Sequence, residues 1–246
     1  MSQQRDGKQP SGRRLRKWQA MRATITEAAR AAFFDKPFDT VTVQQIADQA
    51  DVAVGTLFYH ASSKAELFFL VFNTVLEQAI TEGEAAEAAL PVGADVTDRI
   101  AVLVAPIEGL RHGKHAANMT RYHRELLFSD STGAHRLAGI ELVRRLETRI
   151  AQILCEAHGV DPDNEAGWFA ARAIFAALHF DIASPPAAVD PQSGAGRPGD
   201  SGLATQIAIL VAGFAAFAAA EAGTSRDPDA SRFEEPTTST LIPTTQ

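Results

Sequence analysis

The sequence predicts an all-α fold. Apolar residues recur at spacings of three and four through most of the 246 residues, as the buried face of a helix requires. No run alternates apolar and polar residues strongly enough to predict a strand. Two short helical segments between residues 42 and 61 lie about three residues apart, which is the spacing of a helix-turn-helix.

The first helix is predicted over residues 16–34. Trp18, Met21 and Ile25 begin its apolar stripe, and Pro37 ends it. Residues 1–14 lack such a stripe and are expected to form a mobile basic tail.

The two short helices have different start signals. Thr42 and Gln45 form a capping box at the first. The apolar face of that helix consists of Val43, Ile46, Ala47 and Ala50. Asp51 then predicts a turn, because Asp tolerates the left-handed backbone region better than most residues. The second short helix is predicted over residues 53–61.

The remainder of the chain, residues 63–223, is expected to be a second helical domain. Its first helix opens at another capping box, Ser63 and Glu66. Further helices are predicted over residues 95–110, with Pro106 as a kink or break, and over 115–128, 134–158, 164–182 and 203–222. Pro and Gly predict a loop over 184–202, and composition predicts a disordered tail over 224–246. The helix-turn-helix domain is assigned to residues 15–62.

Charge is distributed unevenly along the chain. The net charge is −7, which argues against a protein that coats nucleic acid everywhere. Residues 1–30 nevertheless hold eight Lys and Arg and two acids, whereas residues 71–246 hold 13 basic and 23 acidic residues. A basic end on an acidic body suggests a local polyanion site, and a solvated basic tail is the alternative. The chain has one cysteine and no apparent secretory leader, so a cytoplasmic protein is expected. Its longest apolar run, 207–220, is short for a membrane span, so no membrane partner is expected.

Residues 53–60 are unusual for a helix that only packs. Gly55 costs about 1 kcal/mol relative to Ala in a helix interior, but a glycine lets the backbone approach another surface closely. Thr56, Tyr59 and His60 carry groups suited to phosphate oxygens. Lys64 follows in the first turn of the next helix, where a cation beside free N–H groups makes a phosphate site, although an ordinary surface lysine is the alternative.

These residues belong to one longer pattern. Its positions are Val43, Ile46, Ala47, Ala50, Val52, Gly55, Thr56, Leu57, Phe58, Tyr59, His60, Lys64 and Leu67. The pattern resembles the signature of TetR/AcrR-family regulators, over about residues 16–72. The resemblance implies an all-helical homodimer whose N-terminal domain binds palindromic operator DNA and whose larger C-terminal domain binds a small ligand that releases the DNA.

The resemblance also implies roles for single residues. The expected phosphate contacts are Thr42, Thr56, Tyr59, His60 and Lys64, with Arg16 or Lys17 reaching phosphate or the minor groove. The expected base-facing positions are Val54, Gly55 and Phe58. Asp51, Ala53 and Ala61 replace the usual turn Gly, capping Ser and aromatic residue. Because Val54 and Gly55 have no hydrogen-bonding side chain, readout is expected to depend on methyl contacts and DNA shape.

A ligand pocket is expected among the helices that span residues 69–178. Its candidate apolar residues are Phe72, Leu76, Val104, Met119 and Trp168, and its polar candidates are Tyr122 and His123. Such a lining predicts a mostly hydrophobic ligand. For residues 121–125 a solvated helix face is favoured over a pocket lining. Trp168, Phe169, Phe175 and Phe180 are predicted to be core residues.

The helices predicted over 164–182 and 203–222 are apolar on nearly all sides, which predicts a homodimer through a four-helix bundle. Two recognition helices would then lie about 34–36 Å apart, or a multiple of that.

Other classes of function have less support. No nucleophile motif, glycine-rich phosphate loop or paired carboxylates point to an enzyme, so no catalytic residue and no cofactor is predicted. His112 and His115 lack a third ligand at suitable spacing, so no metal site is predicted. A helical interaction or scaffold protein remains an alternative, as does a regulator that answers to a protein partner or that activates transcription.

Overall fold

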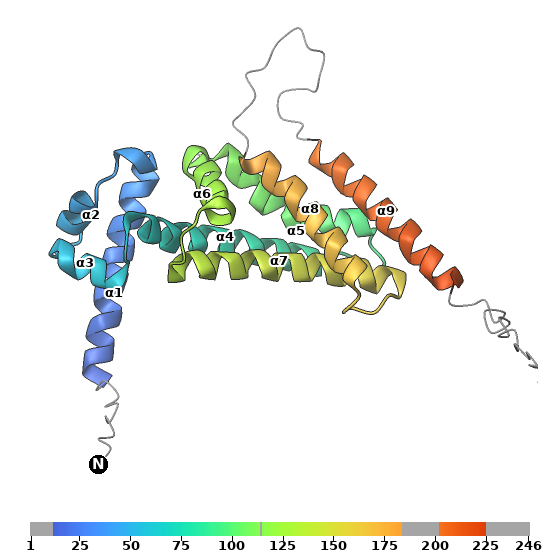
Figure 1. The fold of residues 1–246 in the computed structure, drawn as a ribbon, viewed down its shortest axis with the longest axis horizontal. Coiled ribbons are helices and arrows are strands. Elements are labelled where there is room, and N and C mark those ends of the chain that lie inside the picture. Colours follow the sequence, from blue (N-terminus) through green and yellow to red (C-terminus); the bar gives the residue numbers. More distant parts are fainter. Residues whose placement is uncertain (1–11, 114, 184–201, 225–246) are drawn as a thin grey trace, which may run out of the picture.

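The computed structural model describes residues 12–113, 115–183 and 202–224, and every regular element in those ranges is a helix (Figure 1). The elements are α1 (Gly12–Asp35), η1 (Phe38–Thr40), α2 (Val43–Gln49), α3 (Val54–His60), α4 (Lys64–Ala88), α5 (Val96–Gly109), η2 (Leu110–His112), α6 (Ala116–Phe128), α7 (Ala134–His158), α8 (Glu165–Ala183) and α9 (Leu203–Thr224). Residues 184–201 of the predicted loop over 184–202 and most of both predicted tails lie outside the described residues.

The helix α1 begins earlier than predicted. It starts at Gly12, so residues 12–14 are helical rather than part of the basic tail. Arg and Leu are good helix formers, so residues 13–16 extend the helix without an apolar stripe. Arg13, Arg14, Arg16 and Lys17 therefore lie on a helix that projects beyond α2 and α3 (Figure 1).

The helix-turn-helix has the predicted local structure. Thr42 Oγ1 accepts from the Gln45 amide, and Gln45 Oε1 accepts from the Thr42 amide, so the capping box is complete. Asp51 adopts φ 53° in the turn. Ala53 gives α3 no side-chain cap. Leu57 is the buried residue of α3 and anchors it in the core.

The helix α4 runs from the helix-turn-helix into the rest of the molecule, packing against α1 at one end and against α5 and α7 along its length. Ser63 caps it, accepting from the Glu66 amide. The predicted capping box is wrong in its second half, because the Glu66 carboxylate is turned toward α7. Glu66 is buried and accepts a hydrogen bond of 2.8 Å from the His135 amide.

The middle helices follow the predicted order. The helix α5 runs through Pro106, so of the predicted kink or break the break is wrong. The helix α7 has the predicted bounds and ends at Gly159, which has φ 63°. Cys155 is buried, as predicted.

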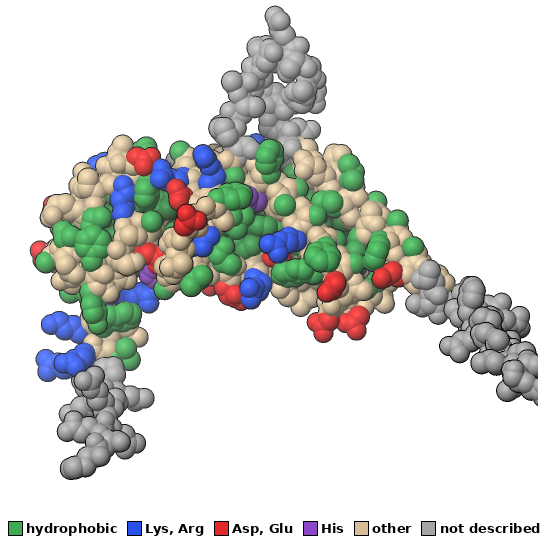
Figure 2. Space-filling view, in the orientation of Figure 1, with side chains coloured by type: hydrophobic (Ala, Val, Ile, Leu, Met, Phe, Trp, Pro, Cys, Tyr) green, Lys and Arg blue, Asp and Glu red, His purple; other side chains and the backbone are tan. Residues whose placement is uncertain are grey.

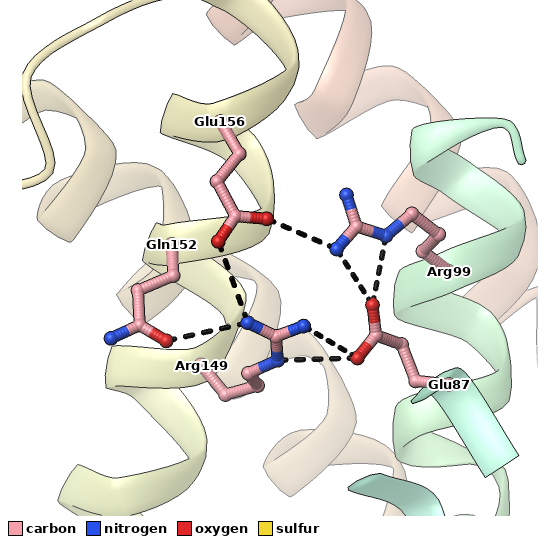
Figure 3. A network of polar contacts seen from close by, with 5 residues as sticks. All are labelled: Glu87, Arg99, Arg149, Gln152 and Glu156. Atoms are coloured by element: carbon pink, nitrogen blue, oxygen red, sulfur yellow. Dashed lines mark hydrogen bonds and ion pairs between the residues drawn. The ribbon is translucent and has the colours of Figure 1, made fainter. Parts of the chain in front are cut away.

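A polar network fastens the end of α4 that lies away from the helix-turn-helix (Figure 3). The Glu87 carboxylate is bound by Arg99 of α5 and by Arg149 of α7, and Glu156 pairs with both arginines. Burial alone would raise the pKa of Glu87, but the hydrogen bonds and charges of Arg149 and Arg99 hold that pKa below its ordinary value.

The last two helices expose apolar side chains. Phe169 is 64% exposed and Phe180 is 75% exposed, so the prediction that both belong to the core is wrong. On α9, Ile209 and Phe217 are also exposed. The apolar stretch Leu203–Gly223 has 21 residues and a mean hydropathy of 2.0, so α9 is long enough to cross a membrane, contrary to the estimate from residues 207–220. A single helix of this kind is weak evidence for a membrane span.

Candidate nucleic-acid interface and its link to the helical core

The outer surface of α3 is open. Tyr59 is 79% exposed and Phe58 is 44% exposed. Apart from its chain neighbours and the backbone of α3, no atom lies within 4 Å of the place where a Cβ on Gly55 would stand. Val54 and Thr56 are half-buried, and Thr42 at the start of α2 is exposed. The predicted contact residues of α2 and α3 therefore present backbone, ring and hydroxyl groups to solvent.

Basic side chains lie next to this surface. Arg16 and Lys17 are exposed on the projecting part of α1, where Lys and Arg side chains gather (Figure 2). Arg30 is paired with Glu27 on the same helix. An exposed recognition surface next to a basic helix is an arrangement that can hold a DNA backbone.

His60 is less accessible than Phe58 and Tyr59. Its half-buried ring lies 5.4 Å from the ring of Trp18, centroid to centroid, which ties the end of α3 to α1. Burial lowers the pKa of His60, and the charge of Arg22 lowers it further, so the ring is neutral at pH 7.

The amine of Lys64, in the first turn of α4, contacts residues of the segment before α2. Its Nζ donates a hydrogen bond of 2.7 Å to the Val41 carbonyl and lies 4.2 Å from the centre of the Phe38 ring. Burial lowers the pKa of this amine. Lys64 thus connects the start of α4 to the segment before α2.

The predicted pocket residues are packed in the core in this conformation. Phe72, Leu76, Val104, Met119, Tyr122 and His123 are all buried. Tyr122 donates a hydrogen bond of 2.7 Å to Asn73 Oδ1, and its ring packs with Phe68, Phe69 and Phe72. The predicted solvated face is therefore wrong for Tyr122 and His123.

Trp168 lies apart from this group. Trp168 is half-buried. It precedes His179 by 11 residues on α8, and the ring of His179 contacts that of His123. At a rise of about 1.5 Å per residue, the two positions are roughly 16 Å apart along the helix. A groove of about 570 Å³ lies nearer to Trp168, between α8 and α9, and its apolar lining includes Phe169, Phe214 and Phe217.

Asn118 joins α6 to the end of α1. Its Nδ2 donates to the carbonyls of Phe33 (2.7 Å) and Lys36 (2.9 Å), and its Oδ1 accepts from the Phe38 amide (2.9 Å). The Phe33 carbonyl has no helical partner, because the residue four positions later is Pro37, which has no N–H. A buried side chain of α6 therefore completes the end of the first DNA-binding helix.

Arg121 strengthens the same junction from the next turn of α6. Its Nη1 lies 2.9 and 2.8 Å from the two carboxylate oxygens of Asp39, and its guanidinium lies 4.2 Å from the centre of the Phe38 ring. Neither Asn118 nor the Arg121–Asp39 pair was predicted from the sequence. Pro37 was the available signal, because it leaves the Phe33 carbonyl in need of a partner.

The fold and the exposed α3 surface define residues 42–60 as a helix-turn-helix with an open second helix. Residues 25–71 match the model of the family described as bacterial regulatory proteins, tetR family. No curated protein sequence matches the chain.

Solved structures share the fold. FadR of Thermus thermophilus, a TetR-family repressor in complex with lauroyl-CoA, is 21% identical, with a TM-score of 0.56 over 78% of this chain and 92% of that one. A TetR regulator of Rhodococcus sp. RHA1 is 22% identical, with a TM-score of 0.54 over 78% and 96%. FadR of Bacillus subtilis, in complex with stearoyl-CoA, is 18% identical, with a TM-score of 0.51 over 78% and 97%.

Residues 25–71 therefore carry the DNA-binding domain of the TetR family of transcriptional regulators, a non-enzymatic family.

Proposed function

We propose that the chain is a homodimeric, cytoplasmic repressor that binds a palindromic operator through α3 and leaves it when a small, mostly hydrophobic effector binds. The open surface of α3 carries the DNA-binding part of this proposal. Tyr59, Phe58 and the backbone at Gly55 are accessible together, and Leu57 holds the helix from the opposite side. Arg16 and Lys17 lie ahead of this surface as backbone contacts.

Fluorescence anisotropy with labelled DNA flanking the chain's own gene tests operator binding. Tyr59→Ala removes a side chain offered to phosphate and is expected to weaken binding about fivefold, the value of one modest hydrogen bond. Val92→Ala is the matched control, since Val92 is fully exposed in the segment between α4 and α5. Equal affinities for both variants would remove Tyr59 from the interface, and no binding by the wild type would sink the repressor proposal.

Lys64 needs a test that separates two roles. As a phosphate contact, Lys64→Met would weaken binding to all sequences and lower the slope of log affinity against log salt by about one. If Lys64 instead serves to bind the Val41 carbonyl, Lys64→Met would leave that slope unchanged and lower the free energy of unfolding. The bond to Val41 supports the second outcome.

The exposed faces of α8 and α9 support the homodimer. Phe169, Phe180, Ile209 and Phe217 form apolar surface that a second copy would cover in a four-helix bundle. Phe217→Glu is expected to yield monomers in sedimentation at micromolar concentration, whereas Val92→Glu should remain dimeric. A dimeric Phe217→Glu protein, or a monomeric wild type, would contradict this interface.

The buried apolar residues around Tyr122 support a mostly hydrophobic effector. Because two similar structures hold long-chain acyl-CoA, lauroyl-CoA and stearoyl-CoA are the first compounds to add to the operator complex. An activator is the alternative: a reporter gene behind the operator would then fall when the regulator is deleted, instead of rising.

A further inference from the structure

Two buried histidines face each other between α6 and α8. His123 is 2% exposed and His179 is 6% exposed, and their ring centroids lie 5.4 Å apart. Neither nitrogen of either ring has a hydrogen-bond partner. Buried polar atoms are nearly always hydrogen-bonded in folded proteins, and each one left without a partner costs about 1–3 kcal/mol. Four such atoms at one place indicate that a polar partner belongs between these helices.

The surroundings of the pair are aromatic. The ring of Tyr122 lies 5.6 Å from that of His123, and the rings of Phe128 and Phe175 each lie 5.8 Å from that of His179. The Tyr122 hydroxyl is already bound to Asn73, so it is not available to the histidines. The site therefore offers imidazole nitrogens in an apolar aromatic setting.

We propose that His123 and His179 anchor the hydroxyl group of an uncharged, aromatic effector of the phenol class. A neutral imidazole carries one N–H donor and one bare nitrogen acceptor. A hydroxyl group donates one hydrogen bond and accepts another, so it can bridge two neutral imidazoles. The proposal deepens the proposed function and rests on it for the regulatory meaning of the site.

The charge state of the pair favours an uncharged ligand. Burial lowers the pKa of His123 to about 3, with help from His179, and burial lowers that of His179 to about 4, so both rings are neutral at pH 7. Arg111, which reaches α8 nearby in the chain, is already paired with Asp181. An anion would bring a buried charge without a compensating cation.

A metal ion fits the pair less well. The described residues contain no cluster of three or more His, Cys, Asp or Glu side chains that could hold one. Two imidazoles alone leave a zinc ion with half of its usual ligands.

The position on α6 gives the site a route to the DNA-binding helices. His123 lies five residues after Asn118, which is about 7.5 Å along the helix axis. A ligand that separates α6 from α8 at His123 would move the side chain that completes the end of α1.

The test uses the full chain with para-ethylphenol, para-butylphenol and para-octylphenol, and with the corresponding methyl ethers, which cannot donate a hydrogen bond. Thermal unfolding and calorimetric titration measure binding. Nitrogen-15 spectra of histidine-labelled protein report hydrogen bonding at the rings. We expect at least one phenol to raise the unfolding temperature, to bind about tenfold more tightly than its ether, and to shift the ring signals of both histidines.

His123→Phe and His179→Phe remove the polar atoms and keep an aromatic ring. Each is expected to unfold at the wild-type temperature or above it without ligand, and to bind the phenol about tenfold more weakly. His158→Phe is the matched control, because His158 also packs a ring against a phenylalanine, Phe214, and has a ring nitrogen without a partner. It should bind the phenol normally.

Three results would overturn the inference: no saturable binding of any phenol in the series, equal affinity for phenols and ethers, or unchanged phenol binding in His123→Phe and His179→Phe. Operator binding without any compound is measured in parallel. If the wild type binds the phenol but no operator, the repressor proposal fails while the histidine site stands.

Discussion

Replacing Asn118 with Ala tests whether α6 holds the DNA-binding helices to the core. The substitution removes hydrogen bonds to Phe33, Lys36 and Phe38. At a net value of about 1 kcal/mol each, the free energy of unfolding should fall by about 3 kcal/mol. The loss should not be smaller, because the Phe33 carbonyl has no substitute donor at Pro37.

Asn73→Ala is the matched control. Asn73 also makes side-chain hydrogen bonds, accepting from Tyr122 and donating to the His135 carbonyl, but these lie among α4, α6 and α7. Urea unfolding should show both variants destabilised, Asn73→Ala by about 2 kcal/mol. Amide hydrogen exchange then separates them, since only Asn118→Ala should speed exchange in α1–α3 while leaving α7 and α8 protected.

A loss of less than about 1 kcal/mol in Asn118→Ala would refute the reasoning, because the three bonds would then be replaced by water at no cost. Equal protection of α1–α3 in Asn118→Ala and in the wild type would refute it in a second way. The junction would then depend on Arg121 and Asp39 and on the packed rings of Phe33, Phe38 and Phe68.

Three further predictions concern stability. Gly83→Ala would press a methyl group into the Leu103 backbone carbonyl, so thermal unfolding should show a loss of about 2 kcal/mol, and a loss below about 0.5 kcal/mol would mean that α5 can move away. Glu87→Gln should lower the free energy of unfolding by about 3 kcal/mol in urea at pH 7. Because the folded-state pKa of Glu87 is lowered, wild-type stability falls as the pH drops below about 4.5, and the difference in stability between wild type and variant should shrink there. A difference that stays constant with pH would exclude the charge of Glu87 as its cause. Burial lowers the pKa of His123 to about 3, so between pH 3 and the ordinary histidine pKa of 6.5 the unfolded chain binds more protons than the folded one. Wild-type stability should therefore decline from pH 6.5 toward pH 4 more steeply than the stability of His123→Phe. Parallel declines would show that this ring is not neutral when the protein is folded.

The sequence predicted those features that depend on neighbouring residues. The capping box at Thr42, the left-handed turn at Asp51 and the end of α7 at Gly159 each depend on side chains or backbone within about five positions. Such interactions need only residues that are close in the chain, so their pattern is visible in the sequence. For this reason the helix bounds in the middle of the chain agree with the structure to within a residue or two.

The sequence did not predict features that depend on distant partners. Glu66 has the right spacing to complete a capping box with Ser63, but burial beside α7 makes the His135 amide the better donor. Lys64 resembles a phosphate contact by position, but Val41, 23 residues earlier in the chain, supplies its acceptor. In both cases a local rule names a plausible partner and packing provides a different one, because a desolvated polar group binds the nearest group that can satisfy it.

The two ties between the DNA-binding helices and the core differ in kind. Glu66 belongs to α4 and fixes the start of that helix to α7, so α4 is held to the core directly after the helix-turn-helix. Asn118 belongs to α6 and reaches outward to the end of α1. A ligand that displaces α6 can therefore pull on α1 while α4 stays in place, which would rotate the α3 surface about the start of α4. The separation of the two recognition helices in a dimer would change with that rotation, and a palindromic operator tolerates only one separation.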